Sequence, residues 1–214
     1  MELMLRQLVP QSFASTITEQ TSDVWKKEIK LSAGEYVSVV APAGYGKTML
    51  IEMLYGLRND YDGDILSGDT TWRQISANRW AQLRAGYISA VFQDLRLFPE
   101  ITLWQNLEVK RRLTDTVPEE RALEILRRLG LADKRDKVVQ QLSHGERQLT
   151  AIVRALLQPF DWLLLDEPFS HLDMINTDRA VDLIREVADA HKAGVLLASL
   201  RSNNYFLYHK TLFI

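Results

Sequence analysis

The sequence contains no cysteine and no long apolar run, and each absence excludes a class of protein. Without cysteine in its 214 residues, the chain has no disulfide, no thiolate metal site and no thiol nucleophile. No uncharged apolar run approaches the ~20 residues that a membrane-spanning helix needs, and the start shows no signal peptide. The four histidines are scattered along the chain. We therefore expect a chain that does not itself cross a bilayer and holds no structural zinc.

A strong positive charge is missing as well. The net charge is −2, so we expect no overall attraction to nucleic-acid phosphates and no nucleic-acid partner. At this length, 46% hydrophobic residues are enough for one substantial core. Strand and helix patterns alternate up to residue 92, a helix-rich middle follows, and apolar runs at 162–165 and 195–199 predict two more strands. This order predicts one α/β domain over residues 1–214, with a mostly parallel sheet and a helical subdomain at about 94–160.

A glycine-bearing loop joins a predicted strand at 37–40 to a predicted helix at 49–54. In such a loop the glycines turn backbone amides toward phosphate oxygens, a lysine supplies a cation, and a threonine hydroxyl can ligate magnesium. An ordinary strand-to-helix turn is the alternative, but Lys-Thr directly after Gly-x-Gly favours nucleotide binding. The strict pattern begins with glycine, and Ala41 can replace it if its φ is negative. The residues expected to bind nucleotide are Ala43, Gly44, Tyr45, Gly46, Lys47, Thr48 and Met49.

Two carboxylates end the predicted strand at 162–165. Ligands of open α/β sheets bind at the carboxyl edge of the strands. There Asp166 can hold magnesium through water, while Glu167 orients or deprotonates the attacking water. The alternative is that the two acids cap a helix, for which Pro168 would suit an early position.

The order of the motifs is more informative than any one of them. The phosphate loop, Gln93 after a strand-like run, Leu142-Ser143-His144-Gly145-Glu146-Arg147-Gln148, Asp166-Glu167 and Ser170-His171-Leu172-Asp173 follow one another in the order seen in ATP-binding-cassette (ABC) ATPases. The chain resembles this family over nearly its whole length. Short matches at 91–99 and 145–148 are similar to the branch of lipoprotein-releasing, macrolide-exporting and cell-division ATPases.

The resemblance implies a P-loop NTPase fold with an amino-terminal antiparallel β region and an inserted α-helical subdomain. It also implies ATP and Mg²⁺ as cofactors, a second ABC subunit as partner in a homodimer or heterodimer, and separate transmembrane permease subunits. The chain would then lie in the cytoplasm, at the inner face of the cell membrane.

The resemblance also assigns roles to single residues. Lys47, Gln93 and Glu167 would be catalytic, and Thr48, Gln93 and Asp166 would hold the metal. Four residues would face the ATP of the opposing subunit: Ser143, His144, Gly145 and Glu146. Asp173 would lie at the dimer seam. Phe13 is the candidate for stacking on the adenine base, and Trp25, the other candidate, fits core packing better.

Two departures from the family pattern leave the function open. The family carries a histidine where this chain has Leu200, and leucine cannot hydrogen-bond. Hydrolysis would then be slow, or a partner chain would supply a competent site. His144 stands where the family has glycine, so one hypothesis is that His144 replaces the missing histidine in trans, and the alternative is a loop side chain without a role. The chain is therefore either an ATP-hydrolysing transport subunit or a nucleotide-gated scaffold with weak hydrolysis.

Overall fold

The computed structural model describes residues 1–15, 22–114 and 117–214, and its strands form two sheets. Antiparallel pairing joins the strands of the smaller sheet. In order across that sheet, they are β2 (Glu28–Leu31), β1 (Leu3–Pro10), β4 (Tyr61–Ser67) and β5 (Thr70–Thr71). The predicted amino-terminal antiparallel region is confirmed.

Every neighbouring pair in the larger sheet is parallel. Its strands in order are β6 (Ile88–Val91), β7 (Trp162–Asp166), β8 (Gly194–Ser199), β3 (Tyr36–Val40) and β9 (Lys210–Phe213). All residues of β3 and β7 are buried, as expected for strands covered on both faces. The predicted mostly parallel sheet is confirmed.

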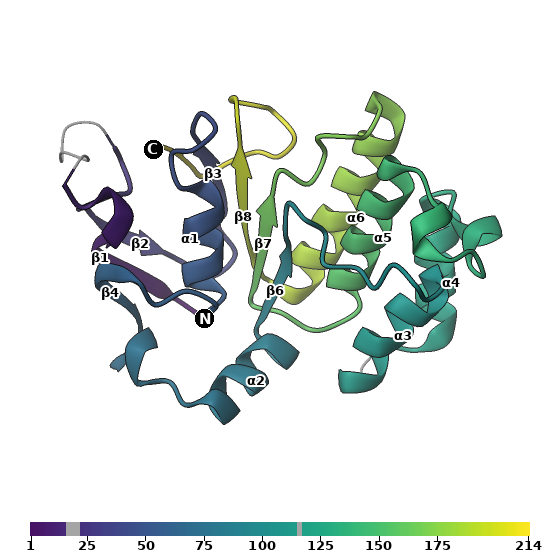
Figure 1. Cartoon of the computed structure of the whole chain (residues 1–214), viewed down its shortest axis with the longest axis horizontal. Helices are drawn as coiled ribbons and strands as arrows, with labels where there is room; N and C mark the ends of the chain where they lie inside the picture. Colours follow the sequence, from purple (N-terminus) through teal and green to yellow (C-terminus); the bar gives the residue numbers. More distant parts are fainter. Residues whose placement is uncertain (16–21, 115–116) are drawn as a thin grey trace.

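Helices cover both faces of this parallel sheet, as Figure 1 shows. The α-helices are α1 (Lys47–Leu54), α2 (Ala77–Gly86), α3 (Leu103–Thr114), α4 (Glu119–Arg128), α5 (His144–Leu156) and α6 (Met174–His191). Short 3₁₀ helices are η1 (Gln11–Phe13), η2 (Trp72–Gln74), η3 (Ala132–Lys134) and η4 (Val139–Gln141). In Figure 1, α1 lies between the two sheets, α5 and α6 lie on the other side of the parallel sheet, and α3 and α4 lie beyond them.

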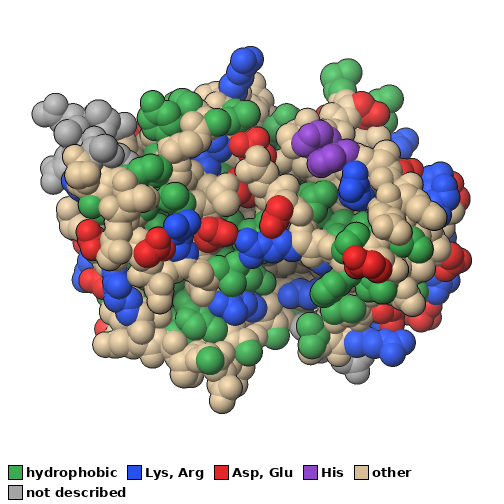
Figure 2. Space-filling model, in the orientation of Figure 1, with side chains coloured by type: hydrophobic (Ala, Val, Ile, Leu, Met, Phe, Trp, Pro, Cys, Tyr) green, Lys and Arg blue, Asp and Glu red, His purple; other side chains and the backbone are tan. Residues whose placement is uncertain are grey.

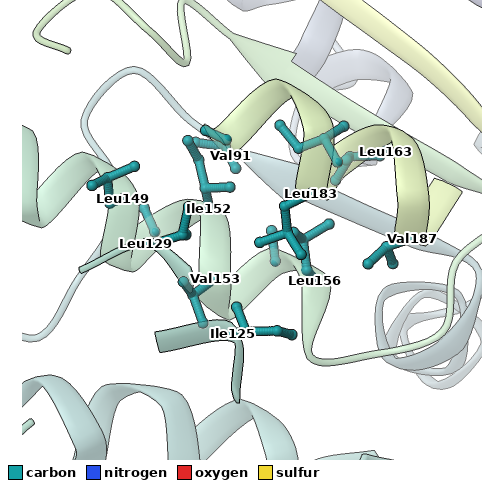
Figure 3. Packing of buried hydrophobic residues seen from close by; sticks show 14 of the residues in the cluster. Val91, Ile125, Leu129, Leu149, Ile152, Val153, Leu156, Leu163, Leu183 and Val187 are labelled. Atoms are coloured by element: carbon teal, nitrogen blue, oxygen red, sulfur yellow. The ribbon is translucent and has the colours of Figure 1, made fainter. Parts of the chain in front are cut away.

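The buried side chains form two hydrophobic clusters, one on each side of the parallel sheet. One cluster joins β1, β2 and α1 to the sheet, with Trp25 and Trp162 fully buried in it. The other packs α4, α5 and α6 against the strands, and Figure 3 shows Leu163 and Val91 from the sheet facing Ile152 from α5 and Leu183 from α6. Each such side chain contributes roughly 1.5–3 kcal/mol through burial, so the sheet is held firmly from both faces.

The helix boundaries follow the sequence signals. Helix α4 begins directly after Pro118 and the chain leaves it through Gly130 at φ 68°, a conformation that favours glycine. Helix α5 is flanked by Ser143 and Leu157. None of the helices in the described ranges has the length and apolar character needed to span a bilayer. The subdomain boundaries at about 94 and 160 stay a prediction.

Candidate nucleotide site

The candidate residues gather at the carboxyl edge of the parallel sheet. Val40 pairs with Ser199, Asp166 with Ala198, and Val91 with Leu165. Strands β3, β8, β7 and β6 therefore end side by side, and the loops that leave them lie at one edge (Figure 1). Parallel strands place their ligand sites at this edge.

The glycine loop after β3 has the conformation that its sequence requires. Gly44 and Gly46 have φ values of 85° and 98°, in the left-handed region that favours glycine. Gly46 precedes α1, and a Cβ added to it would lie 2.9 Å from Cζ2 of Trp25. Ala41 is not among the described residues with positive φ, so alanine replaces the first glycine of the pattern without strain.

Lys47 directs its ammonium back into the glycine loop. Its Nζ donates to the carbonyl oxygens of Ala41 at 2.8 Å and Pro42 at 3.1 Å. It also lies 3.6 Å from Oε1 of Glu167, and the lysine is only 6% exposed. A buried cation is therefore held within reach of both the loop and the carboxylate that follows β7.

Asp166 is a buried carboxylate with one satisfied oxygen. The Thr48 hydroxyl donates to Oδ2 at 2.6 Å, and Oδ1 has no hydrogen-bond partner among the described residues. Burial raises the pKa of Asp166, and so does the negative charge of Glu167, whereas the Thr48 hydrogen bond and Lys47 act in the opposite direction. A hydroxyl and a buried carboxylate oxygen without a partner are the oxygen donors that Mg²⁺ prefers. These residues fit the metal that the sequence predicts.

Glu167 leaves the strand in an uncommon conformation. Its φ is 48°, and its N–H donates to the carbonyl of Ala198 at 2.9 Å. Non-glycine residues in this region cost roughly 1–3 kcal/mol and occur at functional sites. The alternative that the acid pair caps a helix is wrong, because α6 begins at Met174 and Asp173 caps it, accepting from Asn176 N–H at 2.8 Å.

Ser143 begins α5 with a capping box. Its Oγ accepts from the N–H of Glu146 at 3.2 Å, and the Glu146 carboxylate accepts from the N–H of Ser143 at 2.7 Å. A Cβ added to Gly145 would lie 3.0 Å from the carbonyl oxygen of His171, so the segment that follows β7 lies directly against this helix start. The ring of His144 stacks on that of His171, with centroids 3.7 Å apart.

The remaining candidates lie around this edge. Gln93 is exposed immediately after β6. Phe13 is half-buried, and its Cε2 would lie 3.0 Å from a Cβ on Gly46, which brings its ring to the glycine loop. Trp25 is fully buried and donates from Nε1 to the carbonyl of Tyr45 at 3.4 Å, so its ring offers no open face to a base. Leu200 lines a cavity of about 350 Å³ together with Glu167.

Sequence reasoning did not assign every feature that the structure brings together. The capping box could have been found, because Ser-x-x-Glu before an apolar run is its signature. The left-handed Glu167 and the contact between Gly145 and His171 have no local sequence signal, since they depend on how two distant segments pack.

Comparison with known proteins agrees with this geometry. A protein-family model described as "ABC transporter" matches residues 26–170 of this chain. The chain belongs to the ABC transporter family. As an ABC protein of this kind it is an ATP-binding subunit and an ATPase.

Several ABC relatives and solved cassettes are similar to the chain. The lipoprotein-releasing system ATP-binding protein LolD of Legionella pneumophila (strain Lens) is 31% identical over 163 residues, which cover 75% of this chain and 72% of that protein. The aliphatic sulfonates import ATP-binding protein SsuB of Bacillus subtilis (strain 168) is 30% identical over 172 residues, covering 80% and 64%. The dimeric post-hydrolysis structure of the cassette MJ0796 with ADP and Pi superposes with a TM-score of 0.75 at 22% identity, covering 93% and 88%. The fold is therefore that of an ABC cassette.

Proposed function

We propose that this ABC ATPase binds Mg-ATP at the carboxyl edge of its parallel sheet, closes with a second ABC subunit around the nucleotide, and drives a membrane permease. The supporting observation is the group formed by Lys47, Thr48, Asp166 and Glu167, in which a buried cation and two carboxylates meet at a glycine loop. Phosphoryl transfer depends mainly on positioning and charge compensation, and these groups supply both.

Each residue has a separate part in this proposal. The amides of residues 43–49 and the Lys47 ammonium bind the phosphates, and Phe13 stacks on the adenine. Thr48, Asp166 and Gln93 hold Mg²⁺, which when bound neutralises charge on the outer phosphates. Glu167 orients or deprotonates the attacking water. Its position next to Lys47 supports this, because a carboxylate acting on water at the terminal phosphate must lie beside the residue that binds that phosphate.

The partner subunit would complete the site with the start of its own helix α5. Ser143, His144, Gly145 and Glu146 lie at the start of α5, and a helix start presents unpaired N–H groups to an anion. In a head-to-tail dimer this helix start faces the ATP of the opposing subunit, and Asp173 lies at the seam. The dimeric form of the similar cassette MJ0796 supports this arrangement.

A basic cavity near Gln93 supports contact with a permease. It measures about 280 Å³, and none of its described lining residues is a carboxylate. Four cations line it: Arg84, Arg96, Lys110 and Arg154. Burial lowers the pKa of Lys110 to about 8, and Arg154 contributes to this. Arg96 pairs with Glu52 and Asp94, whereas Arg84, Lys110 and Arg154 donate to backbone carbonyls. An acidic segment of a permease subunit would supply carboxylates to these three cations. The chain would then associate with the inner face of the cell membrane from the cytoplasm. The cargo stays unassigned, because LolD and SsuB differ in what they transport by name.

Phosphate release by the purified chain tests the hydrolytic role. We expect steady-state release with Mg-ATP, and Glu167→Gln should lower it by about 10²-fold or more, because the group that acts on the water is lost. The exposed Glu100 provides the matched control, and Glu100→Gln should retain the native rate. Equal rates in the native chain and Glu167→Gln would contradict the role proposed for Glu167. No release above background by the native chain would favour the scaffold with weak hydrolysis.

A further inference from the structure

Two exposed histidines form a stacked pair beside the proposed nucleotide interface. His144 opens α5 and His171 lies in the segment between β7 and α6, and their ring planes meet at 30° with centroids 3.7 Å apart. Figure 2 shows a histidine patch in purple on this face of the molecule. The proposed function includes His144 only as part of the start of α5, and it gives no role to His171 or to the contact between the two rings.

A buried amide fixes the position of His171. Gln148, 2% exposed, accepts the N–H of His171 on Oε1 at 3.0 Å and donates from Nε2 to the carbonyl of Glu167 at 3.0 Å. The same Nε2 donates to Oγ of Ser170 at 3.3 Å. The histidine segment is thus tied through one side chain to the backbone of the residue proposed to act on water.

One neutral tautomer of His171 leaves a donor at Nε2. Ser170 Oγ lies 2.9 Å from Nδ1 of His171, and the direction of this hydrogen bond depends on the tautomer of the ring. Oγ accepts from Gln148 Nε2 and has its own proton, which it can donate to Nδ1. A neutral imidazole carries one N–H, so in that tautomer the ring proton lies on Nε2.

The donor that the family pattern leads us to expect at Leu200 is missing. Leu200 is 47% exposed and lines the cavity that also contains Glu167, where its side chain can make no hydrogen bond to a phosphate. In a head-to-tail dimer, the segments that carry His144 and His171 lie on the face that covers the nucleotide of the opposing subunit. A donor missing in cis can then be supplied in trans.

We propose that His171 donates from Nε2 to the terminal phosphate of the ATP held by the opposing subunit, and that His144 positions the His171 ring by stacking on it. The proposal rests on the head-to-tail dimer proposed above. It assigns the contact to His171 because Gln148 holds the backbone of His171 and Ser170 Oγ bonds to its ring, whereas the ring of His144 stacks on that of His171.

Phenylalanine variants separate the hydrogen bond from the stack. His171→Phe keeps an aromatic ring against His144 but removes the donor, and we expect it to lower phosphate release about tenfold or more, as loss of one phosphate donor does. His144→Ala should also lower release, and His144→Phe should recover most of that loss, because it restores the stack. His191, which packs against Phe160 away from this edge, provides the control, and His191→Phe should retain the native rate.

Leu200→His tests whether the lost group is a phosphate contact. Adding Leu200→His to His171→Phe should restore phosphate release at least partly, because it places an imidazole in the cavity that Leu200 and Glu167 line. Native release in His171→Phe, or a loss in it that Leu200→His does not restore, would overturn the proposal. No recovery in His144→Phe would overturn the positioning role of His144.

Dimerisation separates this contact from the proposed function. With Mg-ATP, Glu167→Gln should form a dimer, and adding His171→Phe should raise its dissociation constant by about tenfold for each charge-assisted hydrogen bond lost, or about a hundredfold in a homodimer, which loses two. No dimer in Glu167→Gln alone would overturn the proposed function together with the contact. A dimer equally stable with and without His171→Phe would overturn the contact alone.

Discussion

Lys47 and Asp166 are buried ions that the protein itself satisfies only in part. Two loop carbonyls accept from the Lys47 ammonium, which also lies 3.6 Å from Oε1 of Glu167, and one carboxylate oxygen of Asp166 has no partner among the described residues. Buried charges of this kind cost free energy unless a counter-charge or metal compensates them. A phosphate for Lys47 and a divalent cation for Asp166 would supply that compensation, which explains why these residue types occur in a place where they reduce stability.

Gly46 makes this loop possible, and its substitution has a defined cost. Gly46→Ala would hold a side chain at φ 98°, with its Cβ 2.9 Å from Trp25, so we expect the free energy of unfolding to fall by about 1–3 kcal/mol. ATP affinity should fall with it, because the amides at the start of α1 would move. Urea unfolding and nucleotide titration measure the two effects.

Gly86 provides the control for Gly46. It lies at the end of α2 with no atom within 4 Å of an added Cβ. Gly86→Ala should leave ATP affinity unchanged and alter stability by less than about 1 kcal/mol. A fully active, fully stable Gly46→Ala protein would show that the loop does not need the left-handed conformation.

Helix α3 and strand β6 both line the basic cavity, and its four cations come from separate segments: α2, the loop after β6, α3 and α5. Arg84 donates to the carbonyls of Tyr55 and Gly56, and Arg154 donates to those of Leu95 and Arg96. These bonds connect α2 to the end of α1, and α5 to the segment after Gln93. A partner that binds in the cavity would therefore contact α2, β6, α3, α5 and the end of α1.

The pH dependence of stability tests the burial of Lys110. Its pKa is about 8 in the folded chain, below the ordinary value of 10.5, so the unfolded chain binds this proton more tightly. The free energy of unfolding should therefore rise between about pH 8 and pH 10, and Lys110→Met should remove on the order of 1–2 kcal/mol of that rise. Urea unfolding of both proteins at several pH values gives the difference.

Lys137 is exposed and provides the matched substitution for Lys110. Lys137→Met should follow the native pH dependence throughout this range. If Lys110→Met does so as well, the ammonium of Lys110 is solvated and the cavity is not the desolvated basic site described here.

At the scale of the whole molecule, the sequence predicts what local patterns encode. The glycine loop, the acid pair and the helix starts each carry a local signal, and the parallel sheet follows from the order of apolar runs. Ala41 is an example, since the structure meets the condition of a negative φ under which alanine can replace the first glycine.

Features that depend on two distant segments could not be predicted. The stack of His144 on His171 joins residues 27 apart in the sequence (171 minus 144), and nothing local indicates that they meet. The same holds for Phe13 against Gly46 and for the cations of the basic cavity. Roles taken from the family pattern, such as those of Gln93 and Asp173, stay predictions.

The central claim is that two ABC subunits enclose one ATP between opposite faces, and the mass of the Glu167→Gln protein in solution tests it most directly. With saturating Mg-ATP, light scattering after size-exclusion chromatography should give twice the mass of the 24.6 kDa chain, or a heterodimer if a second ABC subunit is supplied. With ADP it should give the mass of one chain. A single-chain mass with Mg-ATP, in the presence and absence of that second subunit and with nucleotide shown to be bound, would contradict the account.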